Sequence, residues 1–563
     1  MVQYDPRTSN GPDHLASLLQ VASWGNEQSS EVAKLRALKT LKYSVRALAG
    51  KSPSINTLER DAASENLAAL VKRRVAGVAA MRAAATSMFA AVRAEWSGHM
   101  GMLQQPLDAE RISVHLALAK QTLCIMAEMI KMLPGLAGLQ AEIDALFEEG
   151  LQHTPAIVGA HPELFVRFGE CAASALQHHA LEFRRYLPTF LQMFVEVMVD
   201  LPVDLETLQT APKKLIIVTR FLARVLLAPL YQAERLAKMQ PASEWEPKRA
   251  AAAEAQATIN EFFTTERCAQ VVQALVSKYL VLTPAELEEW QEEPEQAAVN
   301  DSVGILDAID IGEAQSPRPC GTALFLCMIV RQPEAIATTT LALASELQAQ
   351  ADPTPDVWLL RDACYLAIGS GASKIKQALD FNQWYASELR LHLEADVDSS
   401  DLLQRVLQAR SLWLIAQFVA AGAEMADETK QHALGSVLRF LSSVDSKVAL
   451  TAVRVFYVLL ASQSPMLPTE ELGSAANAEF ARQSLEGCFG LLSRLSEIEC
   501  IVAVLKLLTL FVNHSGEHMI PHFGALAEAL PQAWQAVQEQ VANATEARAH
   551  GVMLTMVVAL LRR

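Results

Sequence analysis

Several stretches of this 563-residue chain are apolar on nearly every face that a helix would present. The clearest runs from Ile501 to Val512, with Lys506 inside it. A surface helix of a globular domain needs one apolar stripe, whereas a helix that is apolar on most faces must be covered on most faces. Such helices fit a stack in which each helix lies between neighbours, and this requirement constrains the fold more than any other feature of the chain.

The helical stretches also recur at a regular distance. Pro or Gly separates most of them and the connections are short, which predicts antiparallel hairpins. In the second half of the chain the first helices of the hairpins begin near Phe381, Asp427, Asn477 and Met519. These steps of roughly 40–50 residues match HEAT and armadillo repeats and exceed the ~34-residue TPR unit. The best-defined unit covers residues 427–462: a helix, a tight turn at Ser443–Asp445, and a second helix.

Composition favours the same fold class. Apolar residues make up 51% of the chain but aromatic residues only 6%, because Ala and Leu dominate, and these residues favour helices over strands. We therefore predict an all-α protein, a HEAT/armadillo-like α-solenoid of stacked antiparallel helical hairpins. We expect four segments. Residues 1–30 form a flexible N-terminal segment, and residues 31–281 form an N-terminal helical-repeat half. Residues 282–317 form an acidic insertion of a short helix and a loop, and residues 318–563 form a C-terminal helical-repeat half.

The acidic insertion is the long break in the helical pattern. Residues 279–317 hold ten Asp and Glu and no Lys or Arg. Thr283, Pro284 and Glu286 have the spacing of a capping box, so a short helix is expected to start there and to stop before Pro294. An irregular segment is expected over residues 296–317. The insertion is either a solvated loop between repeats or an acidic partner-binding element, whose candidate residues are Glu288, Glu289, Glu292, Glu293 and Glu295.

The charge of the chain limits its partners. A net charge of −16 repels nucleic-acid backbones and anionic membrane surfaces, so we expect neither as a main partner. The charge favours basic protein partners, or it serves solubility. The longest apolar runs are shorter than the ~20 residues that span a bilayer, and the first residues do not resemble a signal peptide, so no membrane insertion is expected.

The common catalytic and nucleotide-binding motifs are missing from the sequence. It contains no GxxxxGK[ST], HExxH or GxSxG pattern and no complete GxGxxG. No catalytic, cofactor-binding or metal-binding residues are predicted, and the chain is not expected to be an enzyme. Its eight cysteines form no CxxC pair and most lie in apolar helical runs, which is typical of reduced, buried thiols in an intracellular protein.

Four stretches, taken in order, resemble segments of one protein family. They are Leu282–Glu295 with Trp290 shortly before Glu293-Pro294-Glu295, Arg318–Phe325 (RPCGTALF), Leu359–Tyr365 followed by Asp380–Trp384, and Arg410–Phe418 (RSLWLIAQF). Leu38–Tyr43 is similar to an early helix of the same family. The family is the importin-β (karyopherin-β) superfamily, in the branch of importin-11 and importin-7, and the resemblance covers roughly residues 31–460.

The resemblance implies a HEAT-repeat nuclear transport receptor that binds protein cargo, the GTPase Ran and FG-repeat nucleoporins, in the nucleus, the cytoplasm and the nuclear pore. Leu38 resembles a helix that follows the first several repeats of the family, where the main Ran-binding surface lies. The chain is therefore expected to lack those N-terminal repeats and the C-terminal part: a partial gene model, a fragment or a diverged paralogue. The alternative function is a generic HEAT-repeat scaffold for a multiprotein complex.

Trp413 belongs to one of these motifs. It shares a helical face with Leu402, Val406, Ala409 and Ala416, which predicts core packing. A pocket for FG repeats between neighbouring helices is the alternative. Ala416 and Phe418 stand where the family has Gly and Trp.

Overall fold

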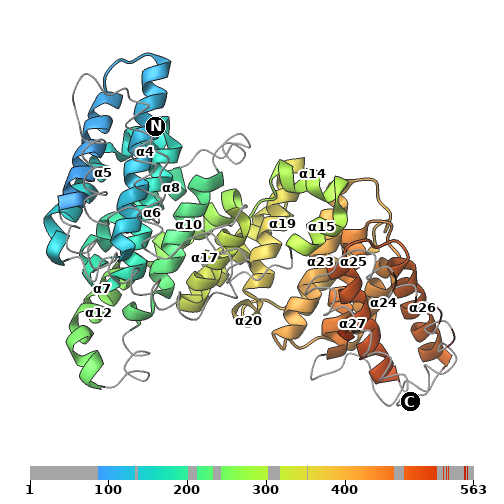
Figure 1. Cartoon of the computed structure of the whole chain (residues 1–563). Helices are drawn as coiled ribbons and strands as arrows, with labels where there is room; N and C mark the ends of the chain where they lie inside the picture. Colours follow the sequence, from blue (N-terminus) through green and yellow to red (C-terminus); the bar gives the residue numbers. More distant parts are fainter. Residues whose placement is uncertain are drawn as a thin grey trace, which may run out of the picture. The chain divides into compact units, whose positions relative to one another are not determined.

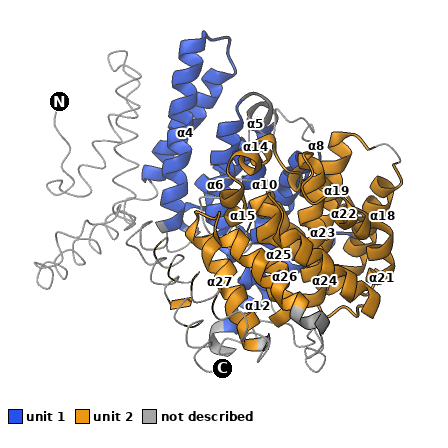
Figure 2. Ribbon diagram, turned by 90° about the vertical axis from the view of Figure 1, so that its right-hand side faces the viewer, with its two compact units in different colours: residues 1–201, 211–264 blue, residues 202–210, 265–563 orange. Residues whose placement is uncertain are grey.

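The computed structural model describes residues 87–132, 137–200, 212–232, 242–301, 317–350, 353–461 and 475–515, together with scattered positions between 524 and 555. The chain forms two compact units (Figure 2). Unit 1 takes residues 1–201 and 211–264, and unit 2 takes residues 202–210 and 265–563. The boundary near residue 264 places the whole acidic insertion in unit 2. The predicted division into four segments stays a prediction, and its first segment lies outside the described residues.

Unit 1 is built from helical hairpins (Figure 1). A helix over residues 87–103 comes first. The following elements are α4 (Ala109–Met132), η2 (Ala137–Leu139), α5 (Gln140–Ala160), α6 (Pro162–His178), α7 (Ala180–Phe183), η3 (Arg184–Tyr186), α8 (Leu187–Asp200), α10 (Pro212–Leu227), η4 (Pro229–Tyr231) and α12 (Ala242–Phe262). Helix α6 packs between α4 and α10, and α8 packs on α10 and α12.

Aromatic rings fill the centre of unit 1. Phe194 of α8 and Phe221 of α10 stack with their ring centroids 4.2 Å apart. Phe147 of α5 meets this group edge-on through Phe190, at 5.0 Å. These side chains are buried. Edge-to-face and offset contacts add about 0.5–1.5 kcal/mol per pair to the effect of burial, so these rings strengthen the contacts between the hairpins of unit 1.

Unit 2 continues the same pattern. Its described elements are α13 (Thr265–Ala274), η5 (Leu275–Tyr279), α14 (Pro284–Glu292), α15 (Pro294–Asn300), α17 (Pro317–Arg331), α18 (Pro333–Gln348), α19 (Pro355–Ser370), α20 (Ala372–Ile375), α21 (Phe381–Trp384), η6 (Tyr385–Leu389), α22 (Arg390–Glu394), α23 (Leu402–Ala420), α24 (Asp427–Leu441), α25 (Ser446–Ala461), α26 (Ala475–Leu492) and α27 (Ile498–Ser515). Elements η5 and η6 are π-helical turns inside longer helices.

The second helices of successive hairpins stack on one another in unit 2. Helix α17 packs on α19, α19 on α23, α23 on α25, and α25 on α27. We call these five helices the second-helix row. The first helices cover one side of it, because α18 packs on α19, α22 on α23, α24 on α25, and α26 on α27. Stacked hairpins of this kind form an α-solenoid.

The prediction of an all-α solenoid is confirmed, since every regular element among the described residues is helical. Helices α21 and α24 begin at the predicted Phe381 and Asp427, and α26 begins at Ala475, just before the predicted Asn477. The start predicted near Met519 lies outside the described residues. Helix α27 contacts α15, α25 and α26, which explains its composition: apolar side chains around most of its circumference are buried, including Ile501, Leu505, Leu508 and Val512.

One local prediction was wrong in part. Residues 296–317 were expected to be irregular, but residues 294–300 form α15, and residues 302–316 lie outside the described residues. Proline ends a helix when it stands in the interior and favours a helix when it stands at the first position, and Pro294 occupies the first position of α15. Among the described residues, no helix combines the length and apolar character needed to cross a membrane.

Gly150 of α5 offers a test of the packing between hairpins. A Cβ atom at this position would lie 2.2 Å from Cε2 of the buried Phe168. Gly150→Ala should lower the free energy of unfolding by roughly 1–3 kcal/mol because the core cannot accept the extra methyl group. The matched control is Gly98→Ala on the exposed side of the helix over residues 87–103, where a Cβ meets nothing within 4 Å. Urea denaturation should show the control unchanged or more stable, and equal midpoints for the two variants would contradict the packing.

His392 of α22 gives a pH-dependent test. Its buried ring lies 5.9 Å from that of Trp358, and burial, together with the charge of Arg361, lowers the pKa of His392 to about 4. The ordinary pKa is about 6.5, so the neutral form stabilises the fold above that pH, and this contribution is lost as the pH falls toward 4. The linked free energy is up to about 3 kcal/mol. His392→Gln should therefore lose less stability than the parent between pH 7 and 4, and parallel losses would contradict this assignment.

Candidate partner-binding surface

The acidic insertion starts with the predicted capping box. The Thr283 side chain accepts a hydrogen bond from the backbone N–H of Glu286 at 3.2 Å, and Glu286 Oε2 accepts one from the backbone N–H of Thr283 at 2.8 Å. Pro284 stands at the first helical position of α14. Both bonds satisfy N–H groups that an uncapped helix would leave without partners, so this local pattern is sufficient to start α14.

The second short helix, α15, lies against α14. Asn300 at its end donates a side-chain hydrogen bond to Glu289 Oε1 of α14 at 2.6 Å. Residues 282–301 thus form one folded element, which we call the strap. Helix α15 packs on α25 and α27 of the second-helix row, and Figure 1 shows it beside α25. The strap therefore connects the beginning of unit 2 with helices that follow it by more than a hundred residues in the sequence.

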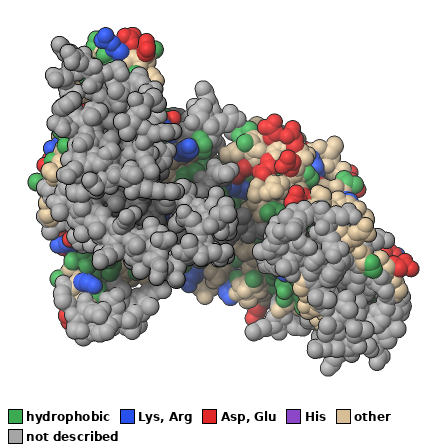
Figure 3. All heavy atoms as spheres, in the orientation of Figure 1, with side chains coloured by type: hydrophobic (Ala, Val, Ile, Leu, Met, Phe, Trp, Pro, Cys, Tyr) green, Lys and Arg blue, Asp and Glu red, His purple; other side chains and the backbone are tan. Residues whose placement is uncertain are grey.

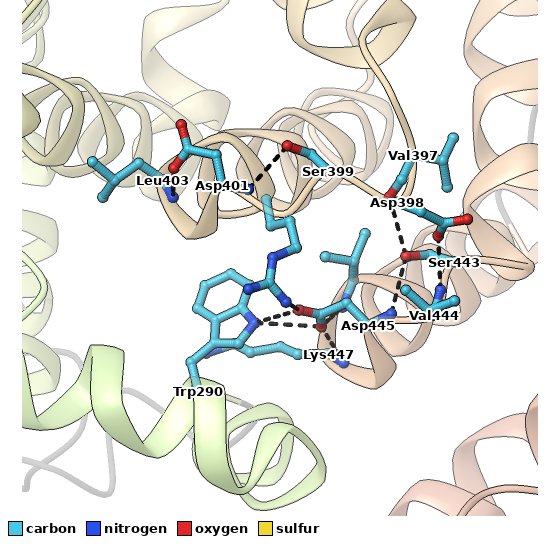
Figure 4. Close-up of polar contacts among 12 residues, drawn as sticks. Trp290, Val397, Asp398, Ser399, Asp401, Leu403, Ser443, Val444, Asp445 and Lys447 are labelled. Carbon is cyan, nitrogen blue, oxygen red and sulfur yellow. Dashed lines mark hydrogen bonds and ion pairs between the residues drawn. The ribbon is translucent and has the colours of Figure 1, made fainter.

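Trp290 holds the strap to α25. Its indole Nε1 donates to the Asp445 carboxylate at 3.1 Å from Oδ2, across 155 residues of sequence (Figure 4). Asp445 also accepts from Arg405 Nη1 at 2.5 Å, and it caps α25 by accepting from the backbone N–H groups of Lys447 and Val448. Trp290 and Asp445 are both buried. One carboxylate therefore joins the strap, α23 and the start of α25.

Lys447 forms a second link at the same place. Its Nζ lies 4.0 Å from the centroid of the Trp290 ring and 2.9 Å from Oδ2 of Asp301 at the end of the strap. A cation over an indole face gains roughly 0.5–2 kcal/mol, more when water is excluded. The Lys447 side chain is buried and that of Asp301 is about half exposed, so the contact with the buried Trp290 ring is the better shielded from water.

The far end of the strap docks on α27. The Glu295 carboxylate accepts hydrogen bonds from the backbone N–H groups of Ser496 and Glu497, at 2.9 and 2.7 Å. These groups precede the first turn of α27, where the helix dipole favours a negative charge. Nearby, Arg454 Nη2 of α25 donates to the carbonyl oxygen of Ala298 at 2.7 Å. Glu295 therefore serves as an N-terminal cap for a helix about 200 residues downstream.

The five candidate carboxylates divide into two groups. Glu288, Glu292 and Glu293 are exposed. Glu289 and Glu295 are half-buried and hold the strap together or in place. Figure 3 shows acidic side chains gathered on the surface in the region where Figure 1 places α14. The outer side of the strap thus presents negative charge at the surface, while its inner side is bound to the second-helix row.

Sequence reasoning missed the residues that receive the strap: Arg405, Asp445, Lys447, Arg454 and Ser496. The available signal was weak. Asp445 ends a predicted turn and precedes a helix, which is typical of an N-cap, but this pattern does not indicate Trp290 as its partner. No group of three or more His, Cys, Asp or Glu in the described part of the chain is arranged to hold a metal ion.

A second ion cluster joins three of the sequence motifs. Asp362 of α19 accepts from Arg318 Nη2 of α17 at 2.6 Å and from Arg410 Nε of α23 at 2.7 Å. Burial opposes the charge of Arg318, but Asp362, Glu286 and Asp301 outweigh it and hold the Arg318 pKa above its usual value. The motif residues therefore connect three consecutive helices of the second-helix row.

Trp413 lies beside this cluster and is half-buried, so the core prediction holds in part. Its ring edge packs on Gly369 of α19, where an added Cβ would lie 2.2 Å from Trp413 Cζ3. The Arg410 guanidinium lies 4.8 Å from the ring centroid. Of its predicted face partners, Val406, Ala409 and Ala416 are buried and Leu402 is half-buried.

Comparison with curated proteins finds distant relatives of one kind. Human and mouse importin-11 are each 23% identical to the chain over 301 residues, which cover 53% of the chain and 29% of importin-11. The importin beta-like protein kap113 of Schizosaccharomyces pombe is 20% identical over 319 residues, 52% of the chain and 30% of kap113. Over about half of its length the chain is therefore similar to importin-11 and to an importin beta-like protein, while no family model matches it.

A solved structure shares the fold of the chain. The exportin Cse1 in its cargo-free, cytoplasmic state aligns with 98% of the chain and 56% of Cse1, with a TM-score of 0.59 and 10% identity. The shared fold is the stack of helical hairpins described above. The region shared with importin-11 spans less than a third of importin-11.

Asp362 provides the test of the motif cluster. Asp362→Ala leaves Arg318 and Arg410 buried without their shared counter-ion, so the free energy of unfolding should fall by roughly 3–5 kcal/mol. The control is Glu394→Ala, which removes the exposed partner of Arg390 and should leave the urea midpoint nearly unchanged. If both variants unfold at the midpoint of the parent, the cluster does not stabilise the row.

Proposed function

We propose that the chain acts as a nuclear transport receptor, or as part of one, and carries protein cargo into the nucleus on its helical-repeat surface. The sequence similarity to importin-11 and kap113 supports this function most directly. The stacked hairpins provide an extended surface of the kind that binds proteins, and the relatives are named for transport, so a non-enzymatic role fits.

The partners proposed are basic protein cargo, the GTPase Ran and FG-repeat nucleoporins, with the receptor present in nucleus, cytoplasm and nuclear pore. The exposed carboxylates Glu288, Glu292 and Glu293 support a basic cargo, because they place three negative charges within one short segment. Each exposed ion pair contributes only about 0–1 kcal/mol, so cargo binding would need further contacts along the row. The net charge of −16 would speed encounter with a basic ligand.

A binding experiment separates this function from that of a generic HEAT-repeat scaffold. The purified chain is immobilised and offered GTP-loaded Ran, GDP-loaded Ran and FG-repeat peptides. A transport receptor should retain FG-repeat peptides and prefer Ran loaded with GTP. Retention of neither Ran nor FG-repeat peptides would favour the scaffold.

The acidic surface is tested by charge removal. The triple variant Glu288→Ser, Glu292→Ser and Glu293→Ser should weaken binding of a fluorescein-labelled Lys/Arg-rich peptide by roughly three- to tenfold at low salt. The difference should shrink as salt is added, because exposed charges are screened. Glu289 and Glu295 are left intact because they hold the strap.

The matched control removes the same charge elsewhere in unit 2, through Glu334→Ser, Glu346→Ser and Asp356→Ser, which are also exposed. It should bind the peptide nearly as the parent does. Equal loss in both triple variants would mean that net charge alone attracts the peptide, and the strap would then have no specific part in cargo binding.

A further inference from the structure

The inner side of the strap covers a group of cations. Lys447 and Arg454 lie on α25, and Arg494 lies in the turn between α26 and α27. Lys447 pairs with Asp301, and Arg454 donates to the Ala298 carbonyl. Arg494 donates to the carbonyl oxygen of Ser443, and the charges of Asp398, Asp445 and Glu295 act on it. Two of the three cations thus contact the acidic strap directly, and the third lies within the field of Glu295.

The start of α27 belongs to the same place. Two backbone N–H groups there, of Ser496 and Glu497, are directed at one carboxylate, that of Glu295, and the Ser496 hydroxyl donates to its other oxygen at 3.3 Å. A helix start with a carboxylate bound to it and guanidinium groups near it has the chemistry of an anion site. In this structure the bound anion is a side chain of the same protein.

The charge of Arg454 is only partly compensated. Burial lowers the pKa of Arg454 despite the nearby charge of Asp301. Its hydrogen-bond partner is a neutral carbonyl group, that of Ala298. A carboxylate at that position would make a charge-assisted bond, about twice as strong as one to a neutral acceptor.

We propose that α25, α27 and the turn before α27 form a binding groove for an acidic, Asp/Glu-rich peptide, and that the strap occupies this groove as an intramolecular competitor. Charge complementarity selects the occupant: Lys447, Arg454, Arg494 and the N-terminus of α27 all favour carboxylates, and Glu295 and Asp301 of the strap supply them. An acidic partner and the docked strap exclude each other. This surface is distinct from the outer, acidic side of the strap, so the proposal does not depend on the transport function.

The test releases the strap and measures binding of a fluorescein-labelled hexaglutamate peptide by anisotropy. The variant Glu295→Gln with Asp301→Asn removes both strap carboxylates that face the cations. It should bind the peptide at least tenfold more tightly than the parent at low salt. Trp290→Phe removes a different contact of the strap, the hydrogen bond to Asp445, and should also tighten binding of the peptide.

Two controls separate a groove from a general charge effect. Glu288→Gln with Glu292→Gln removes the same charge from the exposed side of the strap and should change affinity less than twofold. Adding Arg454→Gln to the released double variant should abolish the gain. The proposal is overturned if the released variant, shown folded by circular dichroism, binds no better than the exposed-side control, or if its gain persists without Arg454. Loss of Ran or FG-repeat binding has no bearing on either outcome.

Discussion

The buried carboxylate of Asp445 is the interaction on which the arrangement of unit 2 most depends. It caps α25, pairs with Arg405 of α23, and receives the indole N–H of Trp290 from the strap. A buried charge is costly unless it is paired and fully hydrogen-bonded, and these donors come from three separate segments. Each contact of Asp445 is therefore stable only when the strap, α23 and the start of α25 are all in place.

Asp362 repeats this principle one step earlier in the row. It joins α17, α19 and α23, while Asp445 joins α23, α25 and the strap. Repeat proteins are stabilised by interfaces between neighbours, so a shared ion cluster at each interface links repeats that apolar packing alone would leave more independent. Helix α23 takes part in both clusters, through Arg405 and Arg410.

Local and periodic features were predictable from the sequence. The capping box at Thr283 needs only residues three apart, and the hairpin of α24 and α25 follows from apolar spacing and a turn. Long-range pairing was not predictable, because nothing near Trp290 indicates which helix start will receive its N–H group. The same limit applies to Glu295: in the sequence it is one of five similar carboxylates, and its capping role depends on the position of α27 in the stack. Pro294 was misinterpreted because proline can both end and begin a helix.

The sequence distance between the strap and its docking site has a consequence for biosynthesis. Trp290 and Glu295 precede their partners by 155 and about 200 residues, so these contacts cannot form while the intervening chain is still being made. At about 5–20 residues per second, the start of α27 follows Glu295 by roughly 10–40 s. Throughout that interval the nascent chain carries an amphipathic, acidic element whose apolar side and indole ring have nowhere to dock. Contacts of such long range are formed late in folding, so the strap stays undocked while most of unit 2 is being made.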